Sequence, residues 1–261
     1  MVTKNGLLKV AILGGLLVTI LVLESEGDMF DYNFKPSPPP NQYGNFLINR
    51  TSEKNNVKPA IFSHWIHRQK HTCRVCHFEL DFSFKVNTTE ITEAENKEGK
   101  YCGASTCHDG KAVFGHTKEN CDKCHNGNIS DGRDKFWPFM KKVPRARYGN
   151  EVDWVKAVDN GILNPVKVLT RKPPTDLKFT KNLELESEAA FISPSAFPHD
   201  KHAEWLDCNN CHPDIFRMKK KADHFNMADM IIGKYCGLCH STVAFPMNDC
   251  KRCHKGMEMT Y

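Results

Sequence analysis

Five copies of one short pattern, Cys-x-x-Cys-His, constrain what this chain can fold into more than any other feature. The copies end at His77, His125, His212, His240 and His254. Two cysteines separated by two residues and followed at once by histidine form the attachment signal for a c-type haem, because the thiols add to the two vinyl groups of one porphyrin and the histidine then faces the iron. A sixth pattern, from Cys102 to His108, has four residues between its cysteines.

These six patterns use all 12 cysteines of the chain. No cysteine is left for a disulfide framework, and a zinc site gives no reason for a histidine directly after every second cysteine. The sequence therefore predicts six covalently bound haem c groups, with a chance cysteine pair as the alternative for the wider pattern. The predicted thioether positions are Cys73, Cys76, Cys102, Cys107, Cys121, Cys124, Cys208, Cys211, Cys236, Cys239, Cys250 and Cys253. The predicted proximal iron ligands are His77, His108, His125, His212, His240 and His254.

The spacing of the patterns limits the fold class. The last three lie within residues 197–261, so the macrocycles must supply most of the core in that part of the chain. Long apolar periodic runs are few, and glycine, proline and lysine are spread throughout. We expect a haem-packed multihaem cytochrome, mostly irregular with small α-helices and little regular secondary structure, plus an N-terminal transmembrane helix.

The charge balance needs to be corrected for the cofactor. The formal net charge is +5, which alone would suit an acidic partner. A ferric haem with two axial histidines and two ionised propionates carries about −1, so six of them bring the total to about −1. The basic balance is therefore mainly compensation for propionates, and nucleic acid is not expected as a partner.

An apolar run from Val10 to Leu23 follows Lys4 and Lys9 near the N-terminus. It predicts an export signal, and residues 4–23 as a helix would span about 30 Å. We expect residues 1–27 to remain as a signal-anchor helix in the cytoplasmic (inner) membrane, with the haem modules in the periplasm; a cleaved signal is the alternative. Residues 28–56 are expected to be an extended linker, or else a tail packed across a partner or the cytochrome itself.

The rest of the chain contains an internal repeat. Phe62-Ser-His64-Trp-Ile-His67 opens the first half, and Phe197-Pro-His199-Asp-Lys-His202 opens the second. In both halves the first of these histidines precedes the first pattern cysteine by nine positions. The predicted parts are a first triheme module at 57–130, a connecting segment at 131–190 and a second triheme module at 191–261. Within the connecting segment, a short helix is expected over 152–158, ending before Asn160-Gly161.

An electron carrier usually keeps both axial positions of each iron filled, so six distal ligands are needed. The histidines outside the patterns are His64, His67, His71, His116, His199, His202 and His224. The Phe-x-His-x-x-His sequences and the wider pattern resemble the class III multihaem cytochromes in their small triheme form, over about residues 60–127 and 195–256. The resemblance implies two tandem triheme modules. It also implies these distal–proximal pairs: His64 with His77, His67 with His108, His199 with His212, His202 with His240, and His224 with His254.

The first half departs from this family, because residues 78–101 contain no histidine. Either His116 or His71 must then be the distal ligand of the haem of His125. We prefer His116, because His71 stands only two residues before Cys73. Methionine ligation by Met227, Met230 or Met247 is a minor alternative, which would raise the potential of the haem concerned.

Filled iron atoms favour electron transfer and disfavour chemistry on oxygen, nitrite or peroxide. We expect a membrane-anchored electron-transfer protein that is not itself an enzyme. The haem count and the anchor resemble the hexahaem subunit of a menaquinone reductase complex, which implies a soluble periplasmic cytochrome as donor and iron–sulfur and integral membrane subunits as partners. The alternative is an extracellular electron-export cytochrome or wire-type carrier. A multihaem enzyme with one five-coordinate iron is a further alternative, of a different class.

Overall fold

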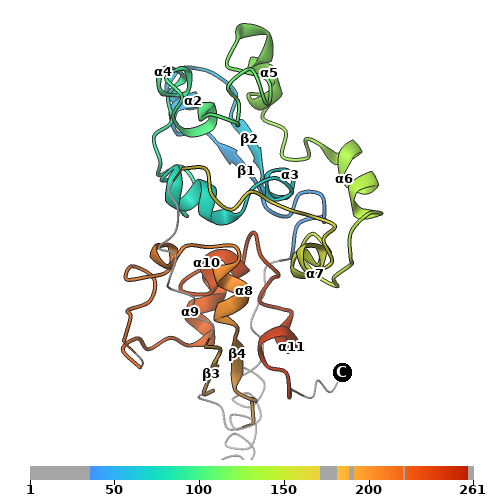
Figure 1. Cartoon of the computed structure of the whole chain (residues 1–261), viewed down its shortest axis with the longest axis vertical. Helices are drawn as coiled ribbons and strands as arrows, with labels where there is room; N and C mark the ends of the chain where they lie inside the picture. The colour runs from blue at the N-terminus through green and yellow to red at the C-terminus, as the bar shows by residue number, and fades with distance from the viewer. Residues whose placement is uncertain (1–35, 171–180, 188–190, 220, 258–261) are drawn as a thin grey trace, which may run out of the picture. The chain divides into compact units, whose positions relative to one another are not determined.

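A computed structural model describes residues 36–170, 181–187, 191–219 and 221–257 (Figure 1). The chain divides into two units, Met1–Pro36 and Ser37–Tyr261, and the helices and strands of the described residues belong to the second. The strands are β1 (Asn45–Ile48), β2 (Ala60–Ser63), β3 (Leu183–Leu185) and β4 (Ser195–Phe197). The α-helices are α2 (Arg50–Lys54), α3 (His64–Arg68), α4 (Glu93–Lys97), α5 (Cys121–Cys124), α6 (Arg133–Met140), α7 (Trp154–Asp159), α8 (His199–Ala203), α9 (Met227–Ile231), α10 (Gly237–His240) and α11 (Cys250–Cys253). One short π-helix is η1 (Val75–Glu79). Three short 3₁₀ helices are η2 (Tyr101–Gly103), η3 (Lys118–Asn120) and η4 (Cys208–Asn210).

These elements are short and are separated by turns and irregular chain. The expectation of a mostly irregular chain with small helices is therefore confirmed for the part that the structure describes. The expected N-terminal transmembrane helix is corrected. Among residues 36–170, 181–187, 191–219 and 221–257, no helix has the length and apolar character needed to cross a membrane. The predicted segment, residues 1–27, lies outside the described residues, and the membrane-anchored form and inner-membrane localisation that rested on it are withdrawn.

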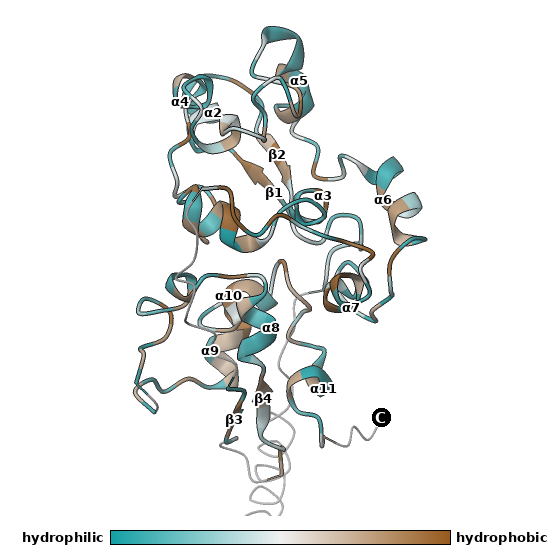
Figure 2. Cartoon of the chain, viewed as in Figure 1, coloured by the Kyte–Doolittle hydropathy of each residue, from teal (hydrophilic) through white to brown (hydrophobic). Residues whose placement is uncertain are grey.

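Each half opens with the same unit, an antiparallel strand pair followed by a short helix. In the first half β1 pairs with β2, with Phe46 opposite Phe62, and β2 continues into α3. In the second half β3 pairs with β4, with Leu183 opposite Phe197, and β4 leads into α8. Figure 2 shows β1 and β2 as hydrophobic and α8 as hydrophilic. Because the two histidines occupy the first and fourth positions of each helix, their rings project from one face.

A second repeated unit surrounds the middle haem pattern of each half. In the first half α4 contacts η2, and in the second α9 contacts α10. A Cβ atom on Gly103 would lie 1.7 Å from the carbonyl oxygen of Asn96, and one on Gly237 would lie 1.7 Å from that of Met230. The tyrosines of the same sequence, Tyr101 and Tyr235, have φ angles of +46° and +50°. The repeated Lys-Tyr-Cys-Gly sequence is thus explained by a tight backbone approach that only glycine permits.

The connecting segment supplies most of the protein core. Its α6, its α7 and the chain between them pack against Trp65 of the first half and Trp205 of the second. The buried residues that they contribute are Phe136, Phe139, Met140, Val143, Val152, Trp154 and Ala157. The helix expected over 152–158 is observed as α7, capped by the Asp153 side chain and followed by Gly161 in the left-handed conformation, with a φ of +69°. This segment therefore packs on both halves. The boundaries proposed for the modules stay a prediction.

Part of the segment expected to be a linker is packed on the rest of the chain. Residues 45–48 form β1, the Gln42 side chain donates a 2.6 Å hydrogen bond to Ser130, and the Tyr43 hydroxyl donates a 2.8 Å bond to the carbonyl oxygen of Ala244. Tyr43 is 3% exposed. Residues 42–48 thus contact the rest of the chain, and the bounds of the expected linker stay a prediction.

Candidate haem-binding sites

In all six histidines that close the cysteine patterns, one ring nitrogen makes a hydrogen bond to the backbone. In each, Nδ1 donates to a backbone carbonyl oxygen, which leaves Nε2 as the unprotonated nitrogen. The acceptors are Phe82 for His77 (2.8 Å), Phe114 for His108 (3.2 Å), Lys58 for His125 (2.9 Å), Phe216 for His212 (2.6 Å), Phe245 for His240 (2.9 Å) and Ser193 for His254 (2.6 Å). This arrangement fits a row of metal ligands, because a ligating histidine is typically oriented by a hydrogen bond at its other nitrogen.

Four of the predicted distal histidines follow the same rule. Their Nδ1 atoms donate to carbonyl oxygens of Gly44 (from His64, 2.8 Å), Ser63 (from His67, 2.8 Å), Lys181 (from His199, 2.9 Å) and Pro198 (from His202, 2.8 Å). Nothing in the sequence spacing requires these bonds. These four histidines therefore carry their proton on Nδ1, as the six proximal histidines do.

Three of the predicted axial pairs are brought together. The ring centres are 6.4 Å apart for His64 and His77, with the planes 7° from parallel. They are 6.2 Å apart for His67 and His108, and 6.1 Å apart for His202 and His240. Two imidazoles on opposite faces of one metal ion should have ring centres about 6.2 Å apart, since the metal–nitrogen bond is about 2.0 Å and the ring centre lies about 1.1 Å beyond the nitrogen. The spacing fits one metal ion between each pair of rings.

The ring spacings given for the described residues do not test the other three predicted pairs. They are His199 with His212, His224 with His254, and His116 with His125. His224 is exposed, and the ring of His116 lies 6.5 Å from that of His108. These three assignments stay predictions.

The two candidates for the third distal ligand of the first half differ in which nitrogen is unused. The Nε2 of His116 is buried without a hydrogen-bond partner, whereas in His71 it is Nδ1 that is buried without one. In the histidines that donate through Nδ1, Nε2 is the nitrogen left for a metal ion. The choice of His116 over His71 as the distal ligand of the haem of His125 stays a prediction.

One phenylalanine ring contacts both predicted distal histidines of each Phe-x-His-x-x-His sequence. The repeat of this sequence in the two halves could have indicated that role. Phe62 stacks on His67 with ring centres 4.4 Å apart and meets His64 edge-on at 4.8 Å. Phe197 repeats this with His202 at 4.4 Å and His199 at 4.6 Å. The phenylalanine of the repeated Phe-x-His-x-x-His sequence is thus a positioning residue for both rings.

Burial keeps the paired imidazoles neutral. It lowers the pKa of His64 to about 3 and the pKa values of His67 and His240 to about 4, against the partly opposing effect of their hydrogen bonds to carbonyl oxygens. Burial also raises the pKa values of Cys76 and Cys236 to about 12, which disfavours a thiolate role in metal binding. A neutral imidazole is the form that binds a metal ion.

The residues present fit haem better than a metal site made of protein alone. In the described residues, no group of three or more histidine, cysteine, aspartate or glutamate side chains could hold a metal ion, and none of the cysteines forms a disulfide. The described side chains therefore form no cluster that would hold a metal ion without a cofactor. When bound, haem supplies an iron atom that gains or loses one electron.

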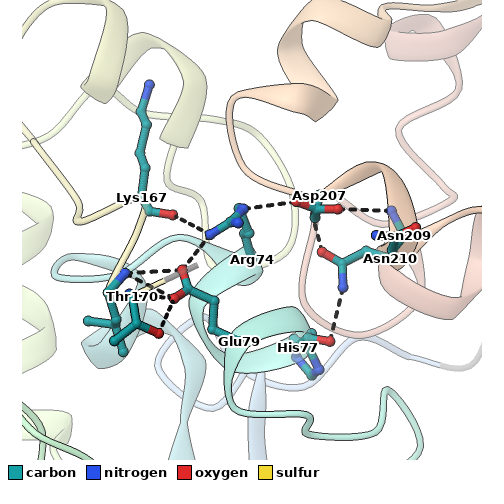
Figure 3. A network of polar contacts seen from close by, with 9 residues as sticks. Arg74, His77, Glu79, Lys167, Thr170, Asp207, Asn209 and Asn210 are labelled. Atoms are coloured by element: carbon teal, nitrogen blue, oxygen red, sulfur yellow. Dashed lines mark hydrogen bonds and ion pairs between the residues drawn. The ribbon is translucent and has the colours of Figure 1, made fainter. Parts of the chain in front are cut away.

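The first haem pattern of one half touches the first haem pattern of the other. η1 contacts η4, and the Asn210 side chain donates a 3.0 Å hydrogen bond to the carbonyl oxygen of His77. Around this contact lies a buried ionic network (Figure 3). Arg74 pairs with Glu79 and, through Nε at 3.0 Å, with Asp207.

Comparison with known proteins identifies the class of protein. Residues 60–126 and 195–255 match the family of cytochrome c7 and related cytochrome c. A solved c7-type three-haem cytochrome domain is 36% identical, over 32% of this chain and 95% of the domain, with a TM-score of 0.27. The chain is a multihaem c-type cytochrome. The family it matches consists of cytochromes c, for which haem c is the cofactor.

Two larger solved structures are also similar to this cytochrome. The C-terminal hexahaem fragment of GSU1996 is 26% identical, over 84% of this chain and 99% of the fragment, with a TM-score of 0.26. The dodecahaem cytochrome c GSU1996 itself is 25% identical, over 84% of this chain and 77% of that one, with a TM-score of 0.29. No curated protein sequence matches the chain.

Proposed function

We propose that this cytochrome relays single electrons through six bis-histidine haems. The observation that carries the proposal is the set of opposed histidine rings, 6.1–6.4 Å apart, whose Nδ1 atoms are fixed by carbonyl oxygens. Side chains on both faces of an iron atom leave no open position for a substrate, so the iron can change only its charge. Twelve cysteines in six patterns support a count of six haems.

The relay would cross from one module to the other near His77 and His212. The hydrogen bond from Asn210 to His77 and the contact of η1 with η4 support this route, because they bring the first haem pattern of each module together. The crossing is held by buried charges rather than by a flexible linker, so the spacing between the modules would be constant.

The electron donor in this proposal is a soluble periplasmic cytochrome. The acceptor is a quinone (menaquinone) reductase complex with iron–sulfur and integral membrane subunits. In this proposal the electrons leave through a protein partner and not directly to the quinone. Cytochrome c domains are typically periplasmic or extracellular, and this setting suits such a donor.

The second candidate is an electron-export cytochrome or wire-type carrier outside the cell. The repetition of one module along the chain favours it, since such modules can be extended in tandem. Purification of the native protein under gentle conditions separates the two functions. Iron–sulfur and membrane subunits that co-purify support the reductase complex, and a multihaem protein found alone at the cell surface supports export.

The relay itself is tested by rapid mixing with a reduced small periplasmic cytochrome. We expect electron uptake to continue until all six haems are reduced, without any reaction of the reduced protein with nitrite or hydroxylamine. Rapid turnover of either compound would instead indicate a multihaem enzyme with one open iron and would contradict the proposal.

A further inference from the structure

Arg68 places a positive charge where the two halves of the chain meet. It directly follows the predicted distal ligand His67 in α3. Its guanidinium lies over the ring of Trp154 at 4.8 Å and over the ring of Trp205 at 4.4 Å. Because Trp154 belongs to α7 and Trp205 to the second half, cation–π contacts hold this charge against segments that are far from it in sequence.

No acidic side chain of the described residues neutralises this charge. The Nε atom of Arg68 is buried without a hydrogen-bond partner, and Nη1 donates a long bond of 3.5 Å to the carbonyl oxygen of Val243. In the described parts of the chain no carboxylate forms an ion pair with Arg68, whereas Arg74 pairs with Glu79 and Asp207. A guanidinium stays protonated in proteins, so a positive charge without a counter-charge from these residues remains here.

The guanidinium lies next to a predicted thioether position of the second half. Its acceptor, the carbonyl oxygen of Val243, belongs to the turn that directly follows Cys239 and His240. The backbone nitrogen of Val243 donates a 2.9 Å hydrogen bond to the carbonyl oxygen of Cys239. The Arg68 side chain therefore contacts the turn that closes the middle haem pattern of the second half.

The same charge lies next to a predicted thioether position of the first half. Cys73 packs on the hydrophobic cluster that contains Trp205, the residue over whose ring Arg68 lies. Burial lowers the pKa of Arg68, and electrostatic interactions with Cys73 and Cys239 partly oppose this effect. Sulfurs bonded to haem as thioethers carry no charge, so haem attachment removes even this compensation.

We propose that Arg68 raises the reduction potentials of two haems, the one attached at Cys73 and the one attached at Cys239. The proposal rests on the proposed relay through haems. Reduction converts ferric to ferrous iron by adding one electron, so a fixed positive charge nearby stabilises the reduced form. This stabilisation is stronger away from water, where the dielectric constant is low. Because the two haems belong to different halves, electrons would rest preferentially at the place where the halves meet.

The test compares wild type with Arg68→Gln, with Arg68→Lys, and with a control, Arg133→Gln, which removes an exposed arginine of α6. Each full-length holoprotein is first checked for haem number by intact mass and for low-spin iron by its spectrum. A redox titration followed by NMR of assigned haem methyl groups then resolves the individual haems.

We expect the Cys73 and Cys239 haems to move to more negative potentials in Arg68→Gln. At the solution potential that half-reduces each of them in wild type, less than half should be reduced in this variant. The other haems should move less, since distance and screening weaken the effect. Arg68→Lys keeps the charge and should stay closer to wild type at both haems, and Arg133→Gln should leave both unchanged.

An unchanged potential at either of the two haems in a fully loaded Arg68→Gln protein would overturn the proposal while leaving the relay function intact. Equal shifts in Arg68→Lys and Arg68→Gln would also overturn it, because they would trace the effect to packing and not to charge. If Arg68→Gln yields no holoprotein, Arg68→Met supplies the uncharged variant, since its flexible side chain can still pack on the indole rings. High-spin haems in the wild-type protein would instead contradict the proposed function itself.

Discussion

A single ring nitrogen distinguishes the histidines of this chain from one another. Ten of them use Nδ1 to donate to a carbonyl oxygen, and they include all six that close a cysteine pattern. His71 differs, because its Nδ1 is buried without a partner. His116 has a buried and unpartnered Nε2. The unpartnered Nδ1 of His71 therefore sets this histidine apart from the ten that donate through Nδ1.

This difference predicts unequal effects of two substitutions. His116→Ala should remove an axial ligand and convert one haem per chain to a high-spin form, whereas His71→Ala should leave every haem low-spin. Low-temperature EPR of the two ferric proteins measures this directly. The opposite result, with high-spin iron in His71→Ala alone, would assign the distal role to His71.

Acid should weaken the folded protein in a defined pH window. The pKa values of His64, His67 and His240 are lowered by burial to about 3, 4 and 4, whereas histidine in an unfolded chain has a pKa of about 6.5. Between these values the unfolded chain binds more protons, so stability falls as the pH falls from about 6.5 towards 4, by about 1.4 kcal/mol per pH unit for each histidine. Denaturant midpoints measured across this window should decrease with acidity. Midpoints that stay constant from pH 6.5 to 4 would contradict the burial of these rings.

Much of the residue chemistry could be predicted from the sequence. The cysteine patterns marked the proximal histidines, and three of the expected pairs, beginning with His64 and His77, have the right ring spacing. The tautomers could not be predicted, because the acceptors include Lys58 for His125 and Ser193 for His254, which are distant in sequence and are brought close only by folding. Arg68 gave no sequence signal, since its partners Trp154 and Trp205 belong to other segments.

Among the elements, η1 and η4 join the two modules through charges that water does not reach. Arg74 and Glu79 are 6% and 9% exposed. The Glu79 carboxylate also accepts hydrogen bonds from the backbone nitrogens of Leu169 (3.0 Å) and Thr170 (2.7 Å). Arg74 thus connects η1, the connecting segment and, through Asp207, the start of η4.

Replacing Arg74 with an uncharged residue should lower the free energy of unfolding. Arg74→Met leaves two buried carboxylates without their common partner, and breaking such a pair typically costs about 3–5 kcal/mol. Arg145→Met removes an exposed arginine that pairs with Glu151, and a surface pair contributes about 0–1 kcal/mol. Chemical denaturation of the two holoproteins, followed by haem absorbance, compares them. Equal losses of stability would show that the buried network is not what joins the modules.

The repeat predicted the elements better than local propensity did. Helices as short as α3 and α8 would not persist in isolation, but the recurrence of Phe-x-His-x-x-His in both halves indicated a common unit, and the structure shows strand–helix units in both places. The connecting segment was harder to interpret. The sequence indicated α7, but the packing of α6 and α7 on tryptophans from both modules depends on contacts between distant parts of the chain.

At the scale of the whole molecule, the absence of long helices and sheets in the described residues agrees with a core that cofactors complete. The protein core in these parts is one cluster around α6, α7 and three tryptophans. The transmembrane helix was the wrong part of the fold prediction, since no helix of the described residues is long and apolar enough to cross a membrane. The irregular, multihaem part of the fold class could be predicted from cysteine spacing, since covalent attachment fixes where each cofactor must lie.

The haem count is a property of the whole chain. The mature protein should carry six covalent haems, one for each cysteine pair including the wider pattern at Cys102–His108. Intact mass spectrometry of the purified protein gives the number directly, and Cys107→Ala should reduce thioether attachment at that site alone. Five haems would show that the wider pattern is a chance pair, and fewer than five would remove the basis for the two-module interpretation.

Low-temperature EPR with spin quantification on the oxidised protein tests bis-histidine ligation most directly. Six haems with both axial positions filled predict low-spin ferric signals that integrate to six spins per chain, with no high-spin component. A high-spin signal that integrates to one haem per chain would mean an open iron atom, and a relay without a reaction site would no longer describe this protein.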